Sequence, residues 1–282
     1  MCSEIRPKAK PETVCNNCKL TIMTTKISEN LSSNTFFHFT KSIENLMDIL
    51  GTTFEPRYCL EKMDYLTITS LDDLEMAYPM VCFCDIPLSK IKQHIGVYGN
   101  YGIGLRKSWG YQQNLSPIIY TRKNARTSKN IEHMISWSFN RLENQKNEED
   151  SEELKEFVSD FIMFTKPYSG KMYRDGKLIK RRFYDEREWR WIPEISKKFA
   201  VRHLTKEEYS NDDFKKNANQ NVALHYKLRF MPDEINYLII NDESEIDNFI
   251  ERLENINKHF DPRTIKRLTS RIITKEQILH DF

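Results

Sequence analysis

The sequence lacks several features that would place a protein in an easily recognised class. It has no run of about 18 apolar residues and no apolar stretch near its start, so we expect neither a membrane span nor a signal peptide. An excess of one charge is also missing, because 43 lysine and arginine residues balance 41 aspartate and glutamate residues. Overall charge therefore gives no reason to expect nucleic acid or an anionic membrane as partner. We expect a cytoplasmic protein.

Cysteine is too sparse for a disulfide-stabilised scaffold, with six cysteines in 282 residues, so reduced thiols are expected. Cys15 and Cys18 have the spacing of half a zinc site. Cys82 and Cys84 would point the same way on a strand, which makes a four-thiolate site geometrically feasible. No second C-x-x-C motif and no histidine pair at the usual spacing follows, so we favour buried strand cysteines and no metal.

The chain length fits one domain with additions, because single domains reach about 250 residues. Residues 1–34 are polar and show little periodicity, which predicts a loosely ordered N-terminal arm. We expect one domain over residues 35–282. No internal repeat of about 20–50 residues is visible, which argues against a solenoid or a propeller.

Local patterns predict strands and helices at both ends of this domain. Residues 35–39 indicate a strand, and Thr40 is a candidate N-cap for a helix that ends at Gly51 and has one apolar face, formed by Ile43, Leu46, Met47 and Leu50. Residues 80–84 indicate a buried strand. Near the C-terminus, the pattern predicts a strand at 235–240, an amphipathic helix at 246–256 and a further short element after 271.

A glycine cluster occupies residues 96–105, with four glycines and two tyrosines. Glycines in such a cluster indicate that the backbone turns there, or that another group packs closely against it. The G-x-x-G-x-G order lacks the preceding strand and following helix of a nucleotide-binding fingerprint. Two interpretations stay open: a glycine-eased loop before a strand, and a ligand-lining loop in which Tyr98 or Tyr101 offers a ring for stacking.

The segment 184–191 carries the most informative chemical pattern. If it is a strand, its period of two puts Glu186 and Glu188 on one face, while Trp189 and Trp191 pack on the other. Two like charges so close raise each other's pKa, as occurs in catalytic sites. A half-buried strand whose carboxylates pair with arginines explains the same pattern, so both interpretations stay open.

A basic run precedes this segment, with six lysines and arginines between residues 171 and 182, and with Lys166 nearby. Such runs are usually solvated, but one beside a site could hold phosphates. The same run could also serve a nucleic-acid-binding module, which is the weakest of the functional hypotheses.

Three blocks of the sequence, residues 37–50, 79–105 and 186–190, together resemble the AbiGi family of bacterial abortive-infection proteins. The resemblance covers about residues 35–282. Members of that family are described as antitoxins of phage-resistance modules. The resemblance therefore implies a role in phage defence, with a cognate toxin or antitoxin as a possible protein partner.

The order of these blocks is also remotely similar to the ADP-ribosyltransferase superfamily and to DarT-type enzymes. That resemblance implies an α+β fold, in which a mixed, split β-sheet is flanked by helices, with NAD as substrate. By it, His38 would bind the nicotinamide-side ribose, with Thr40 in the same site. Tyr98 or Tyr101 would stack on nicotinamide.

The same resemblance makes Glu188 the catalytic carboxylate and Glu186 the residue that orients the acceptor. Cleavage of the nicotinamide–ribose bond builds an oxocarbenium-like centre, which a fixed carboxylate stabilises. A second carboxylate can take the proton of the incoming nucleophile, a role best served by a raised pKa. We expect an NAD-dependent ADP-ribosyltransferase that modifies protein or nucleic acid. The alternative is a non-catalytic antitoxin of the same fold that neutralises a partner toxin.

Overall fold

A mixed β-sheet organises the computed structural model, which describes residues 32–66, 75–144, 148–174, 176–256 and 261–282. Seven strands follow one another in the order β13-β12-β4-β1-β3-β10-β5, and two more strands pair with β3. The bounds are β1 Thr35–Thr40, β2 Arg57–Lys62, β3 Glu75–Cys84, β4 Tyr101–Arg106, β5 Ser116–Pro117, β10 Glu188–Trp191, β11 Leu204–Thr205, β12 Ile235–Ile240 and β13 Ile272–Thr274.

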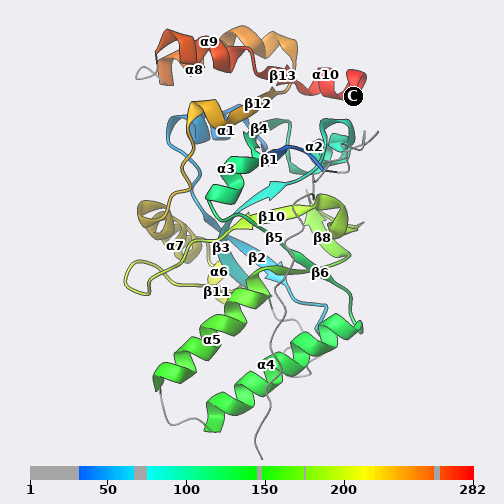
Figure 1. Cartoon of the computed structure of the whole chain (residues 1–282), viewed down its shortest axis with the longest axis vertical. Coiled ribbons are helices and arrows are strands. Elements are labelled where there is room, and N and C mark those ends of the chain that lie inside the picture. The colour runs from blue at the N-terminus through cyan, green and yellow to red at the C-terminus, as the bar shows by residue number, and fades with distance from the viewer. Residues whose placement is uncertain (1–31, 67–74, 145–147, 175, 257–260) are drawn as a thin grey trace, which may run out of the picture. The chain divides into compact units, whose positions relative to one another are not determined.

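Helices and two small sheets complete this α+β fold (Figure 1). The helices are α1 Ile43–Gly51, α2 Lys92–Tyr98, α3 Lys107–Gln112, α4 Arg126–Asn144, α5 Glu148–Met163, α6 Lys206–Ser210, α7 Asp212–His225, α8 Ile246–Ile256, α9 Pro262–Thr269 and α10 Lys275–Asp281. The small sheets pair β6 Ile119–Thr121 with β7 Thr165–Pro167, and β8 Gly170–Arg174 with β9 Lys177–Arg181. The mixed sheet with helices agrees with the fold class predicted from the sequence, whereas the likeness to ADP-ribosyltransferases stays a prediction.

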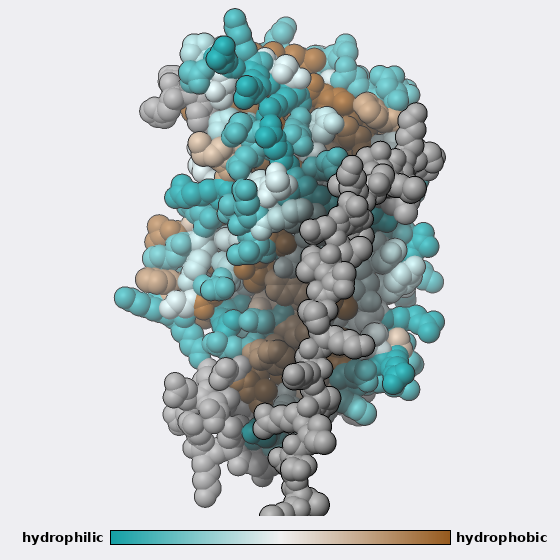
Figure 2. Space-filling view, in the orientation of Figure 1, coloured by the Kyte–Doolittle hydropathy of each residue, from teal (hydrophilic) through white to brown (hydrophobic). Residues whose placement is uncertain are grey.

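Residues Leu31–Phe282 form one compact unit. Most of the N-terminal arm predicted for residues 1–34 lies outside the described part of the chain, as do Cys15 and Cys18. No described helix is long and apolar enough to cross a membrane. Much of the face shown in Figure 2 is hydrophilic.

The sheet divides at β3, because the two halves of this strand have different partners. The half from Glu75 to Met80 pairs with β2 along its whole length. At the other end, β1 pairs with β3 at Phe37 and Cys84 alone, although β1 pairs with β4 along six residues. The sheet is therefore open beside β1, and the side chain of His38 fills part of the opening by donating from Nδ1 to the carbonyl oxygen of Cys82 at 2.8 Å.

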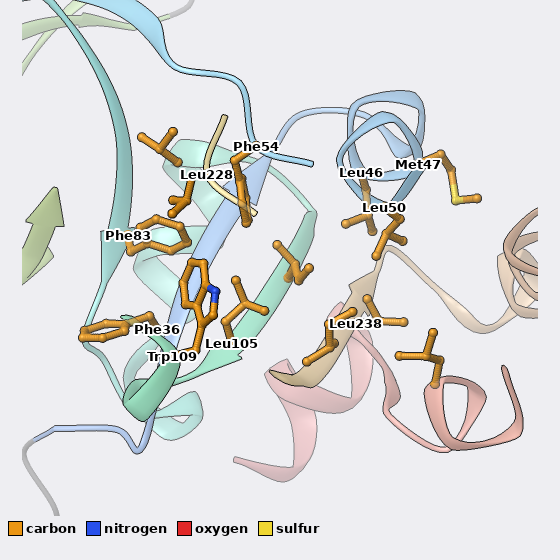
Figure 3. Packing of buried hydrophobic residues seen from close by; sticks show 14 of the residues in the cluster. Phe36, Leu46, Met47, Leu50, Phe54, Phe83, Leu105, Trp109, Leu228 and Leu238 are labelled. Carbon is orange, nitrogen blue, oxygen red and sulfur yellow. The ribbon is translucent and has the colours of Figure 1, made fainter. Parts of the chain in front are cut away.

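The largest apolar core packs α1, α3 and α8 against strands β1, β3, β4 and β12 (Figure 3). The apolar face predicted for the first helix is confirmed, since Leu46, Met47 and Leu50 are buried. Its predicted N-cap is wrong: Ser42 accepts the hydrogen bond from the backbone N–H of Asn45. Thr40 cannot cap the helix because it is the last residue of β1 and pairs with Tyr101 of β4.

The C-terminal pattern is confirmed as a β-α-β unit. β12 and β13 are parallel and adjacent, and α8 and α9 lie between them in the chain. The amphipathic pattern of α8 buries Phe249 and Leu253 in the main core. All the other pairings in the main sheet are antiparallel, so this unit makes the sheet mixed.

The glycine cluster forms the end of α2 and the start of β4. Gly99 follows the last residue of α2 with φ 138°, a conformation that L side chains rarely adopt. A Cβ atom on Gly99 would lie 2.0 Å from the carbonyl oxygen of Thr40. The close contact fixes Tyr98 on α2 and Tyr101 on β4 at opposite sides of one tight turn.

We expect Gly99→Ala to lower the free energy of unfolding by roughly 3 kcal/mol, because it adds both backbone strain and a clash with Thr40. Gly96→Ala is the matched control. Gly96 lies inside α2 with nothing within 4 Å of an added Cβ, so this change should stabilise by about 0.5–1 kcal/mol. Urea unfolding of both variants measures the difference. Equal stabilities would contradict the role assigned to Gly99.

Candidate functional site

The segment predicted as one strand from 184 to 191 is divided in two. Residues Phe183–Glu186 form a 3-10 turn, Arg187 has the left-handed φ of 44°, and only Glu188–Trp191 forms strand β10. Glu186 and Glu188 are therefore not neighbours on one strand face, and that prediction is wrong. The physical reason is the partner: β10 pairs with β3 from Glu188 onward, and β3 ends at Cys84, opposite Glu188.

The second half of the pattern behaves as predicted. Glu188 and Arg190 are buried on one face of β10. Trp189 packs on the other face against Phe36, with ring centroids 4.8 Å apart. One face of this strand thus supports the core, and the other carries charged groups.

Lys166 forms an ion pair with both Glu186 and Glu188. This residue lies on β7, and its Nζ is 3.1 Å from an Oε2 of Glu186 and 2.8 Å from Oε2 of Glu188. Both glutamates are almost fully buried: 2% of the surface of Glu186 and 7% of the surface of Glu188 is exposed. Burial of charged groups is costly unless they are paired, so the ammonium is the contact that allows two carboxylates here.

The other carboxylate oxygen of each glutamate accepts a hydrogen bond from an arginine, and that of Glu186 also accepts one from a tyrosine. Glu188 Oε1 accepts from Arg190 Nε at 2.6 Å, and Arg190, which is fully buried, also lies 3.0 Å from Glu61 on β2. Glu186 Oε1 accepts from Arg181 Nε at 2.7 Å and from the Tyr98 hydroxyl at 2.5 Å. We call this set the ion-pair network; it consists of Glu61, Glu186, Glu188, Lys166, Arg181 and Arg190. Its formal charges cancel.

The network shifts the pKa of Glu188 and of Lys166 in the direction that keeps each side chain charged. Burial alone would raise the pKa of Glu188, but the charges of Arg190 and Lys166 outweigh burial and hold it well below its usual range. Burial would likewise lower the pKa of Lys166, yet the nearby Glu188 and other carboxylates raise it well above its usual value. The raised carboxylate pKa expected from two like charges is therefore wrong for Glu188, because each carboxylate faces cations rather than the other carboxylate alone.

A cavity of about 1260 Å³ opens beside this network. His38, Tyr98, Glu186 and Glu188 all contribute to its wall. The ring of His94 packs on the ring of Tyr98 with centroids 4.7 Å apart. His38 and Glu188, which are 150 positions apart in the sequence, thus line the same cavity, at the opening in the sheet beside β1.

Both histidines near the cavity are neutral at pH 7. Burial lowers the pKa of His38, and a carbonyl oxygen can only accept, so Nδ1 of His38 carries the proton that it donates to Cys82. Nε2 of His38 is then a hydrogen-bond acceptor. Burial and the charge of Arg181 lower the pKa of His94 to about 3.

Two predicted site residues do not reach the cavity wall. Thr40 is buried at the end of β1 and is not among the lining residues. The Tyr101 hydroxyl donates to Glu245 at 2.8 Å, and burial together with Glu245 raises its pKa to about 12. Of the two candidate tyrosines, the structure places Tyr98 on the wall; the contacts of all these residues with NAD stay a prediction.

The strand cysteines lie at the same wall. Cys82 and Cys84 both line the cavity, and burial raises the pKa of both thiols, which keeps them protonated. Among the described residues, no group of three or more histidine, cysteine, aspartate or glutamate side chains is placed to hold a metal ion. The zinc half-site formed by Cys15 and Cys18 lies outside the described residues.

Sequence reasoning missed four members of the network as site residues, namely Glu61, Lys166, Arg181 and Arg190. For Lys166 and Arg181, the sequence suggested phosphate or nucleic-acid binding rather than ion pairs with the glutamates. The signal available for these two and for Arg190 was a basic residue close to the glutamates in the sequence. Glu61 lies on β2 in a segment with no motif, so the sequence alone offered no signal for it.

Comparison with known proteins gave a family and a relative. A family model described as "Putative abortive phage resistance protein AbiGi, antitoxin" matches residues 52–241. A protein of Lactococcus lactis subsp. cremoris named "Abortive phage resistance protein AbiGi" is 28% identical over 255 residues, which cover 81% of this chain and 99% of that protein. No solved structure matches the chain.

The lowered pKa of Glu188 makes stability depend on pH in a predictable direction. The folded state binds fewer protons than the unfolded state below the ordinary pKa of 4.5, so the contribution of Glu188 is present above that pH and is lost as pH falls. We expect Glu188→Gln to flatten the stability profile between about pH 4.5 and pH 3 by up to roughly 1.4 kcal/mol per pH unit.

At neutral pH, the same variant should lose about 3 kcal/mol of unfolding free energy, because the balanced network loses one buried negative charge. Lys166 then keeps only Glu186 as a counter-charge, and Arg190 keeps only Glu61. Glu251→Gln, on the exposed face of α8, is the matched control and should leave the profile unchanged. Urea unfolding at a series of pH values measures both. Parallel profiles for wild type and Glu188→Gln would refute the pKa assigned to Glu188.

Proposed function

Because this chain belongs to the AbiGi family of abortive phage resistance proteins, we propose that it acts in phage defence by cleaving the nicotinamide–ribose bond of NAD and transferring ADP-ribose to a macromolecular acceptor. Family membership supports phage defence. The chemistry is our own inference from the cavity.

A single observation carries the proposal. His38 on β1, Tyr98 at the end of α2, and Glu186 and Glu188 around the start of β10 come from three distant segments of the chain, and all of them line one cavity. The sequence resemblance had assigned these same residues to one NAD site. A cavity with an aromatic ring, a neutral histidine and an ionised carboxylate suits a ligand that has both a planar ring and ribose hydroxyls.

Glu188 has the properties of a group that stabilises positive charge. Its lowered pKa keeps it ionised at neutral pH, and Lys166 and Arg190 fix its position. Each carboxylate oxygen of Glu188 has two acceptor sites. Among the described residues one side chain donates to each oxygen, which leaves one acceptor site on each for a ribose hydroxyl. A fixed, ionised carboxylate stabilises the oxocarbenium-like centre that forms when nicotinamide leaves with the bonding electrons.

The other wall residues have supporting roles. His38, which accepts at Nε2, can hold a ribose hydroxyl, and the ring of Tyr98 can stack on nicotinamide. The acceptor's nucleophile forms the new bond to the ribose carbon and loses a proton. Glu186 is the second carboxylate on the wall and can take that proton if it exchanges one of its three donors.

The proposal predicts that the purified protein releases nicotinamide from NAD, and that Glu188→Gln lowers the rate by about 100-fold or more. Release is measured with and without bacterial DNA, RNA and protein extract, and circular dichroism checks that each variant is folded. His38→Ala is a second active-site variant, so the test does not depend on Glu188 alone. Glu251→Gln is the control with the same chemical change on an exposed helix face.

Release that rises with one extract and falls in both active-site variants would identify a transferase and its class of acceptor. A larger rise in KM for Tyr98→Ala than for Tyr101→Ala would assign stacking to Tyr98. If the folded wild-type protein releases no nicotinamide in any mixture, the proposed enzymatic activity is wrong.

A specific observation favours a second candidate function. The ion-pair network is complete without a ligand, because cations of the chain already bind Glu186 and Glu188, and the matching family model is described as an antitoxin. A non-catalytic protein that binds and neutralises a toxin needs no more than this stable scaffold. Under this alternative, a folded Glu188→Gln variant would protect cells from the partner toxin as well as wild type does, whereas loss of protection would count against it.

A further inference from the structure

Two of the four lysines on the cavity wall form no ion pair with a described residue. The lysines that line the cavity are Lys62, Lys166, Lys171 and Lys180. Lys62 lies 3.6 Å from Glu75, and Lys166 binds both glutamates of the network. Within the described residues, Lys171 and Lys180 have no carboxylate within 4 Å. They are the two lysines of the wall that form no ion pair with a described residue.

The two lysines are also direct neighbours. Lys171 lies on β8 and Lys180 on β9, and they stand opposite each other in the antiparallel register of this hairpin. Residues opposite each other have side chains on the same face, with Cβ atoms about 5 Å apart, and like charges in such positions destabilise a hairpin. An anion bound between the two ammonium groups removes that repulsion.

The hairpin is anchored to the wall that carries the glutamates. Arg181, the residue after Lys180, binds Glu186 through Nε. At the start of β8, Gly170 lies so close to the ring of Phe183 that an added Cβ would be 2.8 Å from it. The hairpin therefore presents its lysines at a fixed place relative to the candidate site.

We propose that Lys171 and Lys180 form a subsite for the diphosphate of a nucleotide that binds in this cavity. A diphosphate carries adjacent anionic groups that two converging ammonium groups can bind together. A cavity of about 1260 Å³ has room for a nucleotide as well. The inference rests on the proposed function in one respect: the nicotinamide of the same ligand reaches Tyr98, and its ribose reaches His38 and Glu188.

The test is calorimetric titration of the full chain with ADP and with adenosine at constant ionic strength. Lys171→Gln/Lys180→Gln should weaken ADP binding about tenfold or more, as expected for the loss of charge-assisted hydrogen bonds, and should leave adenosine binding unchanged. Lys177→Gln is the matched control, because Lys177 is exposed on the same hairpin but is not part of the cavity wall. It should change ADP binding less than twofold if contact, rather than general attraction of charge, holds the diphosphate.

Three results would overturn the subsite: ADP that does not bind wild type, an unchanged affinity in the double variant, or an equal loss in Lys177→Gln. Nicotinamide release separates this inference from the proposed function. Lysine-dependent ADP binding by a protein that does not cleave NAD supports the subsite and refutes the enzyme. Cleavage of NAD with the same KM in the double variant and wild type supports the enzyme and refutes the subsite.

Discussion

Lys166 places one ammonium group between the carboxylates of Glu186 and Glu188, and the architecture around the cavity depends on this contact. An unpaired buried charge costs several kcal/mol, so two buried carboxylates need cations beside them. Each further buried cation needs a carboxylate in turn, as Arg190 needs Glu61 on β2. The requirement for charge balance therefore links β2, β7, β9 and β10, which are distant in sequence, around one site.

This balance constrains the chemistry that the cavity can support. Glu188 is held as an ionised acceptor by its two cations, which suits stabilisation of positive charge and does not suit a general acid. Glu186 accepts from three donors, including Tyr98, so any proton transfer to it requires one of those hydrogen bonds to break. The two glutamates are thus chemically different, although the sequence presents them as an equivalent pair.

Local patterns in the sequence correctly predicted which faces of single helices and strands are buried. The 3.6-residue period of α1 gave its buried face correctly, and the period of two separated Glu188 from Trp189 on β10. The errors arose where a distant partner decides the outcome. Thr40 pairs with β4 and so cannot cap α1, and the end of β3 at Cys84 sets the point where β10 begins. Resemblance to known families brought His38, Tyr98 and Glu188 to attention. Only the fold could show that Tyr98 lines the cavity and Tyr101 does not, since both lie beside the same turn.

The two end strands in the order of the main sheet, β5 and β13, affect whether another protein chain can pair with the sheet. One edge is β5, which has two residues, the second of them Pro117, and the other edge is β13, which has three. Proline has no backbone N–H to donate, and such short edges offer too few free backbone groups to recruit another strand. At these two edges, extension of the sheet into a second molecule is disfavoured. A protein partner would have to be recognised there by side chains instead, and edge-to-edge aggregation through these two strands is disfavoured.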